Sequence, residues 1–242
     1  MRTRFIWRAL RTRYRDQKAE LAAIKSTIQS NGIAVDVGAN KGSYLYWLAR
    51  WVPDGKAVAF EPQEELAQYL RAAATTIPMK NVVVEAKGVA DRPGLLEFFS
   101  PGGTISPGAS FSRRVPDREE CAQQSKEVVT LDAYFEEGSP ISVIKVDVEG
   151  FELQVFKGAQ RILEEASPLL VFECENRHLE QGSVGDILNF LYERGYDGHF
   201  VHRGELIPAN QFNAAIHQPE EGENFFKSKN YCNNFVFRKS HA

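Results

Sequence analysis

The chain has 242 residues, of which 43% are hydrophobic and 25% are charged, with a formal net charge of -3. This composition is typical of a globular protein with one main domain, which at this length buries roughly 70 to 75% of its unfolded surface. Because no overall positive field surrounds an acidic chain, we do not expect nucleic acid as a partner.

Two further features of the composition bear on location. No apolar stretch is long enough for a signal sequence or a membrane span. The three cysteines, Cys121, Cys174 and Cys232, are widely spaced and form no CxxC pair, which argues against a disulfide framework or a zinc site. We therefore expect a protein of the reducing cytoplasm.

The first thirty residues are predicted to form a basic amphipathic helix that is separate from the unit at 31–242. Within about 3–29, apolar residues recur every seven positions at Trp7, Tyr14, Leu21 and Ile28, with Leu10 and Ile24 between them. The first eighteen residues carry Arg2, Arg4, Arg8, Arg11, Arg13, Arg15 and Lys18 against Asp16 alone. Such a helix packs on its own domain, associates with a second copy or binds anionic lipid.

Strands and helices then alternate along the chain. Strands are expected at 33–37, 56–61, 81–87 and 94–99, and helices begin at Lys41 and at Glu64. Further on, strands are expected at 141–150 and 168–175, helices at 151–166 and 183–196, and terminal strands at 199–208 and 233–237. This alternation predicts an α/β fold with a doubly wound, mostly parallel sheet that ends in an antiparallel hairpin.

The segment from Pro101 to Lys126 is the least regular part of the sequence. It mixes Gly, Pro, Ser and charged residues without a sustained period. Because a loop of this length inside a compact domain is usually functional, we interpret it as a lid over a substrate.

Acidic residues stand at the predicted carboxyl ends of the strands, where ligands bind in such sheets. They are Asp36, Glu61, Asp147, Glu149, Glu173 and Glu175. Glu61 follows Asp36 by 25 positions, close to the ~20-residue interval at which a carboxylate accepts hydrogen bonds from a ribose in dinucleotide folds. A ribose-containing ligand is therefore expected.

The turn "VDVGANKG", Val35 to Gly42, favours one kind of ribose ligand over another. Its glycines allow a tight turn and a close approach to the backbone, and the helix that follows presents unpaired N–H groups. The turn lacks a full GxGxxG, and Asp36 would repel a pyrophosphate, which argues against a nicotinamide cofactor. S-adenosylmethionine fits better because its sulfonium and ammonium groups are positive and its carboxylate suits a helix N-terminus.

The blocks "VDVGANKG", "AFEP", "VVTLDAYF" and "IKVDVEGFELQVFKGA", in this order, resemble the FkbM family of S-adenosylmethionine-dependent methyltransferases. The resemblance spans about Gly32 to Glu175 and implies a Rossmann-like class I methyltransferase domain at 31–242. It implies that the methionine part of the cofactor binds near Asp36, Gly38 and Asn40, the ribose at Glu61, and the adenine beside Gly88 and Val89. Gly42, the second glycine of the turn, is also expected to contact the cofactor. Ala90 stands where the family usually has a small polar residue.

Methyl transfer to oxygen requires a group that removes the hydroxyl proton of the acceptor. We expect Asp147, within the intact "DVEG" block, to be this base, with Lys145 orienting it and His178 as the alternative base. The expected acceptor contacts are Ser110, Arg113, Arg114, Glu149 and Glu175, with the two arginines clamping an anionic acceptor. The same acids are also suitable ligands for Mg²⁺, but we expect no metal.

The sequence thus predicts a cytoplasmic O-methyltransferase that acts on a hydroxyl, with a small molecule or a glycan intermediate as acceptor. The acceptor class follows from the family resemblance alone. Two alternatives remain open, a nucleotide-binding oxidoreductase and a non-catalytic scaffold that binds the cofactor. Contact with a membrane or self-association through the N-terminal helix is the expected further interaction.

Overall fold

The computed structural model describes residues 2–103, 105–106, 108–113, 121–221 and 224–239. The strands of its central sheet are β1 (Ile33–Val37), β2 (Lys56–Phe60), β3 (Val82–Glu85), β7 (Ile141–Val146), β8 (Leu169–Glu173), β9 (Tyr196–His202), β10 (Glu205–Pro208) and β11 (Asn234–Lys239). They are ordered β10-β9-β11-β8-β7-β1-β2-β3 across the sheet.

The pairing of these strands brings the predicted ligand-binding ends together. Strands β3, β2, β1, β7 and β8 are parallel, so their carboxyl ends lie at one edge of the sheet. Strand β11 inserts antiparallel between β8 and β9, and β9 and β10 form an antiparallel hairpin. This topology confirms the predicted doubly wound, mostly parallel sheet with an antiparallel C-terminal hairpin.

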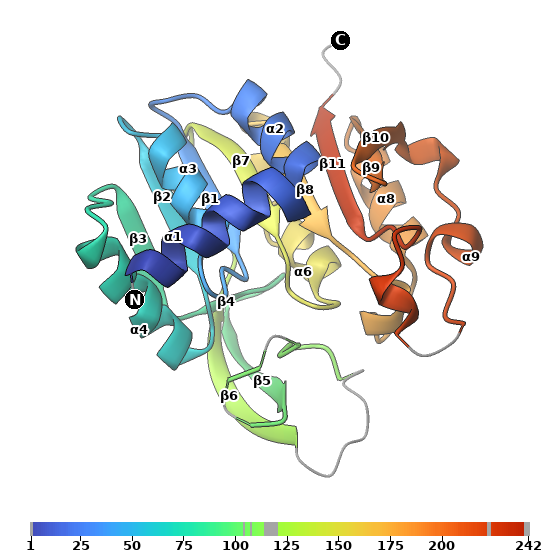
Figure 1. The fold of residues 1–242 in the computed structure, drawn as a ribbon, viewed down its shortest axis with the longest axis horizontal. Coiled ribbons are helices and arrows are strands. Elements are labelled where there is room, and N and C mark those ends of the chain that lie inside the picture. The colour runs from blue at the N-terminus through green and yellow to red at the C-terminus, as the bar shows by residue number, and fades with distance from the viewer. Residues whose placement is uncertain (1, 104, 107, 114–120, 222–223, 240–242) are drawn as a thin grey trace.

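Helices cover both faces of the sheet (Figure 1). They are α1 (Arg2–Arg11), η1 (Thr12–Asp16), α2 (Lys18–Thr27), α3 (Leu45–Trp51), α4 (Glu64–Thr76), α5 (Leu131–Tyr134), α6 (Glu152–Lys157), α7 (Gln160–Glu165), η2 (Asn176–His178), α8 (Val184–Tyr192), η3 (Ala209–Gln211), α9 (Ala214–His217) and η4 (Phe225–Lys227). The core has two parts, one on each face of the sheet, because successive side chains of a strand point to opposite faces. On β1, Ala34 packs toward α1 to α4 and Val35 packs toward α5 to α8. Small residues on the first face let these helices approach the sheet closely.

A second sheet of three strands projects from the edge where β3 ends (Figure 1). It consists of β4 (Gly88–Val89), β5 (Gly94–Pro101) and β6 (Cys121–Val129), ordered β4-β6-β5. The prediction of a loop from Pro101 to Lys126 is therefore wrong after Cys121, where β6 pairs antiparallel with β5. The strand could not be recognised from the sequence of β6, because that sequence is polar and few of its side chains are buried. The strand forms through its pairing with β5.

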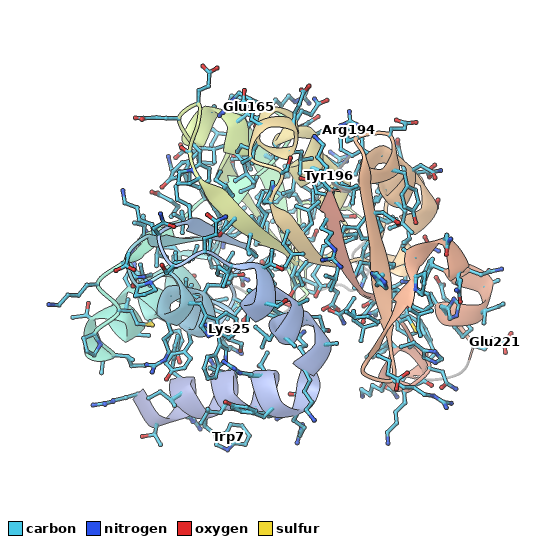
Figure 2. All side chains as sticks on the ribbon, turned by 90° about the horizontal axis from the view of Figure 1, so that it is seen from above. Trp7, Lys25, Glu165, Arg194, Tyr196 and Glu221 are labelled. Atoms are coloured by element: carbon cyan, nitrogen blue, oxygen red, sulfur yellow. The ribbon has the colours of Figure 1, made fainter. Side chains whose placement is uncertain are left out.

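The N-terminal helix also differs from its prediction, because the chain bends within it. A π-helical turn at Thr12–Asp16 and a non-helical Gln17, at φ -135 and ψ 53, separate α1 from α2. Phe5 is buried on α1, whereas Trp7 and Tyr14 are 59% and 60% exposed. The prediction of one continuous apolar stripe is therefore wrong, because the bend changes which side of the helix faces the domain. Trp7 points away from the body of the protein (Figure 2).

The N-terminal helices pack on the α/β unit. The indole Nε1 of Trp47 donates to the carbonyl of Ala9 at 2.8 Å, and the Arg13 guanidinium lies 4.4 Å from the Trp47 ring centre. Arg8 Nη1 donates to the carbonyl of Lys41, within the turn after β1, at 3.0 Å. Among the described helices, none has the length and apolar character to cross a membrane.

The predicted helix at 151–166 is also interrupted, by Gly158 between α6 and α7. A Cβ at Gly158 would lie 2.0 Å from the carbonyl oxygen of Ala90. The backbones thus meet at a distance that only glycine permits, and this contact fixes α6 against the segment that follows β4.

Candidate functional site

The turn after β1 is shaped by a crossing of two backbones. Gly38 has φ +74, and a Cβ there would lie 1.8 Å from the carbonyl oxygen of Asp147, which follows β7. The N–H groups of Gly38 and Ala39 both donate to the carbonyl of Phe60 on β2, at 3.0 and 3.1 Å. Asn40 also has positive φ, at 46°. The turn is thus held by strands on both sides, which leaves its open side as a cradle of bare backbone.

Glu61, directly after β2, faces this turn. Its Oε2 accepts from the Asn40 N–H at 2.7 Å and its Oε1 accepts from the Gln63 N–H at 2.9 Å. The side chain is buried, and this burial raises the pKa of Glu61 to about 7. The carboxylate is therefore fixed in orientation, and each oxygen keeps a second lone pair for a donor in the cavity.

A cavity of about 660 Å³, including the space at its mouth, runs from this turn to the second sheet. Its walls are formed by Val37, Gly38, Asn40, Phe60, Glu61, Pro62, Gln63, Lys87, Gly88, Val89, Phe98, Ala109, Phe111, Asp147, Val148 and Glu149. The end beside Gly88 is lined by Val89 and the rings of Phe98 and Phe111, and Phe111 packs directly on Gly88, where a Cβ would lie 2.4 Å from its ring. A flat aromatic base fits this end, and a ribose fits the end beside Glu61.

Beneath the turn, a buried lysine lies between two carboxylates. Lys145 Nζ is 3.4 Å from Asp36 Oδ1 and 3.3 Å from Asp147 Oδ2, and it donates to the carbonyl of Gly38 at 3.2 Å. Burial raises the pKa of Asp36, although the lysine opposes it. Burial would lower the pKa of Lys145, but the two carboxylates outweigh it and the net shift is upward.

The carboxylate of Asp36 forms few hydrogen bonds within the protein. Neither of its oxygens has a hydrogen bond of good geometry with any described residue, and the ion pair with Lys145 is its main compensation. Asp36 is fully buried and does not line the cavity, so Lys145 is the cation that compensates its charge in this structure.

The turn "DVEG" after β7 is held from the far side by η2. Glu149 has φ +55, and a Cβ at Gly150 would lie 2.1 Å from the carbonyl oxygen of His178. His178 Nδ1 lies 2.7 Å from Glu149 Oε2. Burial lowers the pKa of His178, but the hydrogen bond to Glu149 prevails and raises it. His178 thus holds Glu149 in place and is itself outside the cavity wall.

Three of the predicted acceptor contacts, Ser110, Arg113 and Glu175, lie elsewhere than at the cavity wall. Ser110 is buried, and its hydroxyl lies 2.9 and 2.7 Å from the carbonyls of Val148 and Glu149, so it attaches the loop to the "DVEG" turn. Arg113 is exposed and lies 3.5 Å from Glu97. Arg114 is outside the described residues.

Glu175 sits in a closed hydrogen-bonded cluster after β8. Its oxygens accept from Arg177, from the Tyr231 hydroxyl at 2.8 Å and from Asn233 Nδ2 at 3.0 Å. Although burial opposes the shift, the Arg177 guanidinium lowers the pKa of Glu175. Burial and the nearby carboxylates of Asp147 and Glu149 instead raise the pKa of Glu173 well above its usual range.

The cavity wall therefore unites seven of the residues predicted from the sequence. These are Gly38, Asn40, Glu61, Gly88, Val89, Asp147 and Glu149. Asp36 and Lys145 lie beneath the turn, and Gly42 lies behind it, where a Cβ would meet Phe5 and Leu70 at 2.8 and 2.7 Å. In the described part of the chain, no group of three or more His, Cys, Asp or Glu side chains is placed to hold a metal ion.

Sequence reasoning missed several residues of this site. Phe98, Ala109 and Phe111 come from the irregular segment and its flank, and no local pattern marks them as wall residues. Tyr44 is buried with its ring centre 5.3 Å from Lys145 Nζ, and the sequence only indicates it as an apolar helix position. Gln63 has a local signal, since it follows Glu61 by two positions in the same "FEPQ" turn.

The fold and this site define a class I S-adenosylmethionine-dependent methyltransferase domain. A family model described as "Methyltransferase FkbM domain" matches residues 36–197. The chain belongs to the FkbM methyltransferase family, whose methyl donor is S-adenosylmethionine.

Solved structures agree with this fold. Methyltransferase FkbM from Methylobacillus flagellatus KT has a TM-score of 0.57 and 16% identity, over 93% of this chain and 47% of that one. A protein from Streptococcus mutans, assigned as a methyltransferase and solved in complex with SAH, has a TM-score of 0.53 and 14% identity, over 92% and 97% of the two chains. Precorrin-6y C5,15-methyltransferase from Geobacter metallireducens GS-15 has a TM-score of 0.50 and 11% identity, over 93% and 88%.

This chain spans about half the length of the Methylobacillus flagellatus protein. At these identities the structural likeness shows the fold alone. No curated protein matches the sequence.

Proposed function

We propose that this protein transfers a methyl group from S-adenosylmethionine to a hydroxyl oxygen of a sugar or glycan intermediate. The observation that carries the proposal is that one cavity joins the glycine turn and Glu61 to the carboxylates of Asp147 and Glu149. A donor site and proton acceptors thus share one space. Half-buried carboxylates also suit an acceptor rich in hydroxyl groups, because they accept hydrogen bonds from such groups.

The cofactor fits the residues that form the turn and the cavity wall. Its methionine part fits the cradle at Gly38 and Asn40 above Asp36, and its ribose hydroxyls fit Glu61 as donors to a fixed carboxylate. Its adenine fits the end of the cavity that Gly88, Val89 and Phe98 line. When bound, S-adenosylmethionine supplies an electrophilic methyl group on a positive sulfonium.

Asp147 is the residue of this chain that we assign as general base. Its Oδ2 is paired with Lys145, which leaves Oδ1 as the oxygen that accepts the proton of the acceptor hydroxyl. Its side chain is 31% exposed, so a substrate can reach it. His178 is less suited because its raised pKa favours the protonated form and because Glu149 occupies its Nδ1.

The experiment is a methyl-transfer assay with a panel of sugars and glycans, which measures the release of S-adenosylhomocysteine. Asp147→Asn should lower turnover by roughly 10² to 10⁴, the usual contribution of acid-base assistance, with cofactor affinity unchanged. His178→Gln should cause a smaller loss. A chelator should have no effect on the wild type, whereas a Mg²⁺-dependent reaction would be abolished and then restored by the metal.

Two outcomes would overturn the proposal. Full activity in Asp147→Asn would remove the assigned base, and methyl transfer to a deoxy analogue of the acceptor would show that the modified atom is not that hydroxyl oxygen. If the protein binds S-adenosylmethionine but methylates nothing in the panel, the result supports the scaffold alternative. The family match already argues against the oxidoreductase alternative.

We also propose that the protein acts in the cytoplasm, with contact to a membrane through its N-terminal helices. The three cysteines, Cys121, Cys174 and Cys232, are all free thiols, as expected in a reducing compartment. Self-association through the same helices is the competing form of contact. Fractionation of cells under reducing conditions tests the first point, and recovery of the protein only from an oxidising compartment would contradict it.

A further inference from the structure

The helix α1 has two faces of different character. Its inner face packs on the domain through Phe5 and Ala9, which are buried. Its outer face, which we define as Arg4, Trp7, Leu10 and Arg11 together with Tyr14 of the following turn η1, is exposed to solvent. Trp7, Leu10 and Tyr14 are 59%, 39% and 60% exposed, and Figure 2 shows Trp7 projecting from the molecule. Large apolar side chains in a row on a surface mark a site of interaction.

The charge around the outer face is opposite to that of the whole protein. The chain carries a net charge of -3, yet its first eighteen residues hold seven basic residues and one acid. That acid, Asp16, is shared by Arg11 Nε at 2.9 Å and Arg15 Nε at 2.7 Å. The arginines therefore retain an excess of positive charge beside the apolar row, and an anionic partner is required.

A basic groove lies beside the first half of α1, where this helix meets α3 and the turn after α4. Its lining includes the cations Arg2, Arg50 and Lys80 and the apolar side chains of Ile6 and Met79. The three cations are exposed, and they belong to α1, α3 and the turn after α4. The cations of the groove thus flank one side of the row of Trp7 and Leu10, and Arg4 and Arg11 flank the other side.

The shape of the outer face favours a lipid surface over a protein partner. Trp7 on α1 and Tyr14 on η1 are both more than half exposed and form a ridge on the surface. The Tyr14 ring is supported from within by Trp47, with the ring centres 6.1 Å apart. A protein partner would need a groove that matches this convex ridge, whereas a bilayer interface deforms around it. Trp and Tyr also prefer the headgroup level of a bilayer, where arginines pair with anionic lipids.

We propose that the outer face of α1 docks this protein on an anionic lipid bilayer, with α1 lying in the interface plane. Trp7, Leu10 and Tyr14 enter the headgroup region, and Arg4 and Arg11 bind lipid phosphates. The docking rests on the membrane contact proposed above, for which it names the surface and the lipid, and it uses none of the residues of the cavity wall. It therefore succeeds or fails independently of the assigned reaction.

The test is sedimentation of the purified full-length chain with vesicles of phosphatidylcholine, with and without phosphatidylglycerol. Trp7 is also a fluorescent reporter, because Trp47 and Trp51 are both 7% exposed and remain in the core. We expect binding only to vesicles with phosphatidylglycerol, a blue shift of the Trp7 emission, and weaker binding at high salt. Each of the variants Arg4→Gln and Arg11→Gln should weaken binding by about fivefold, and Trp7→Ala by roughly tenfold.

The matched controls are Leu95→Ala on β5, where the side chain is 71% exposed, and Lys157→Gln on α6, also at the surface. Both should bind vesicles as the wild type does, and all variants should bind S-adenosylmethionine normally, which confirms folding. Equal binding to neutral vesicles, or unchanged binding in Trp7→Ala with Tyr14→Ala, would overturn the proposal. It would also fail if the wild type ignored vesicles and formed a dimer that Trp7→Ala dissociates.

Discussion

Replacement of Glu61 by Gln tests how the cavity recognises a ribose. Both oxygens of Glu61 accept backbone N–H groups, from Asn40 at 2.7 Å and from Gln63 at 2.9 Å. A glutamine has one oxygen, so its amide N–H₂ must face one of these donors or turn away. Glu61→Gln keeps the volume of the side chain but removes its charge and one of its two acceptors.

The magnitudes follow from burial and hydrogen bonding. A hydrogen bond to a charged partner is worth about 1.5 to 3 kcal/mol, so Glu61→Gln should weaken S-adenosylmethionine binding by roughly ten- to a hundredfold. Burial raises the pKa of Glu61 from 4.5 to about 7. Because the ionised form is the better acceptor, wild-type affinity should rise as pH increases through about 7, and the affinity of the variant should lack this rise.

The same shift in pKa has an opposite effect on stability. Below pH 4.5 both the folded and the unfolded chain hold the proton of Glu61, and between pH 4.5 and about 7 only the folded chain does. The contribution of Glu61 to stability is therefore complete below 4.5 and is lost as pH rises to about 7, by about 3 kcal/mol. Glu61→Gln should remove this loss from the pH dependence of unfolding.

The assay is calorimetric titration with S-adenosylmethionine across this pH range, together with urea unfolding of the free protein. Glu64→Gln is the control, since Glu64 begins α4 close by but is half exposed. Affinity that is unchanged in Glu61→Gln would show that the ribose does not contact this carboxylate. An equal effect in Glu64→Gln would show that general surface charge, not the buried acceptor, is responsible.

The remaining predictions concern the turn and the buried lysine. Gly38→Ala should abolish cofactor binding or folding, because its Cβ would lie 1.8 Å from the Asp147 carbonyl. Gly138 has the same φ of +74 but open space around it, so Gly138→Ala should lower the free energy of unfolding, measured by thermal unfolding, by only about 1 to 3 kcal/mol. Similar losses in the two would refute the crowding argument. Lys145→Met should lower the free energy of unfolding by about 3 to 5 kcal/mol, because Asp36 would lose its cation, and the added change Asp36→Asn should restore most of it. Wild-type stability in Lys145→Met would show that the pair contributes nothing.

Local patterns in the sequence were sufficient to predict the frame of the site. The alternation of strands and helices places Asp36, Glu61 and Asp147 at strand ends, and parallel strands bring such ends to one edge. The glycines of the turn after β1 indicate bare backbone whatever surrounds them. These features depend on neighbours in the chain, which is why local patterns indicated Gly38, Glu61, Asp147 and Glu149 of the cavity wall. Asn40, Gly88 and Val89 were expected there from the family resemblance.

Tertiary contacts decided the features that spacing left open. The enclosure of Glu175 needs Tyr231 and Asn233, which are more than fifty residues away. Strand β6 exists through its pairing with β5, because its own sequence is polar. Which side of α1 is buried depends on the bend after it and on the helices that it meets, so the seven-residue repeat of Trp7 and Tyr14 marks an outer face. A periodic pattern shows that a helix has two sides, but only packing determines which of them faces the core.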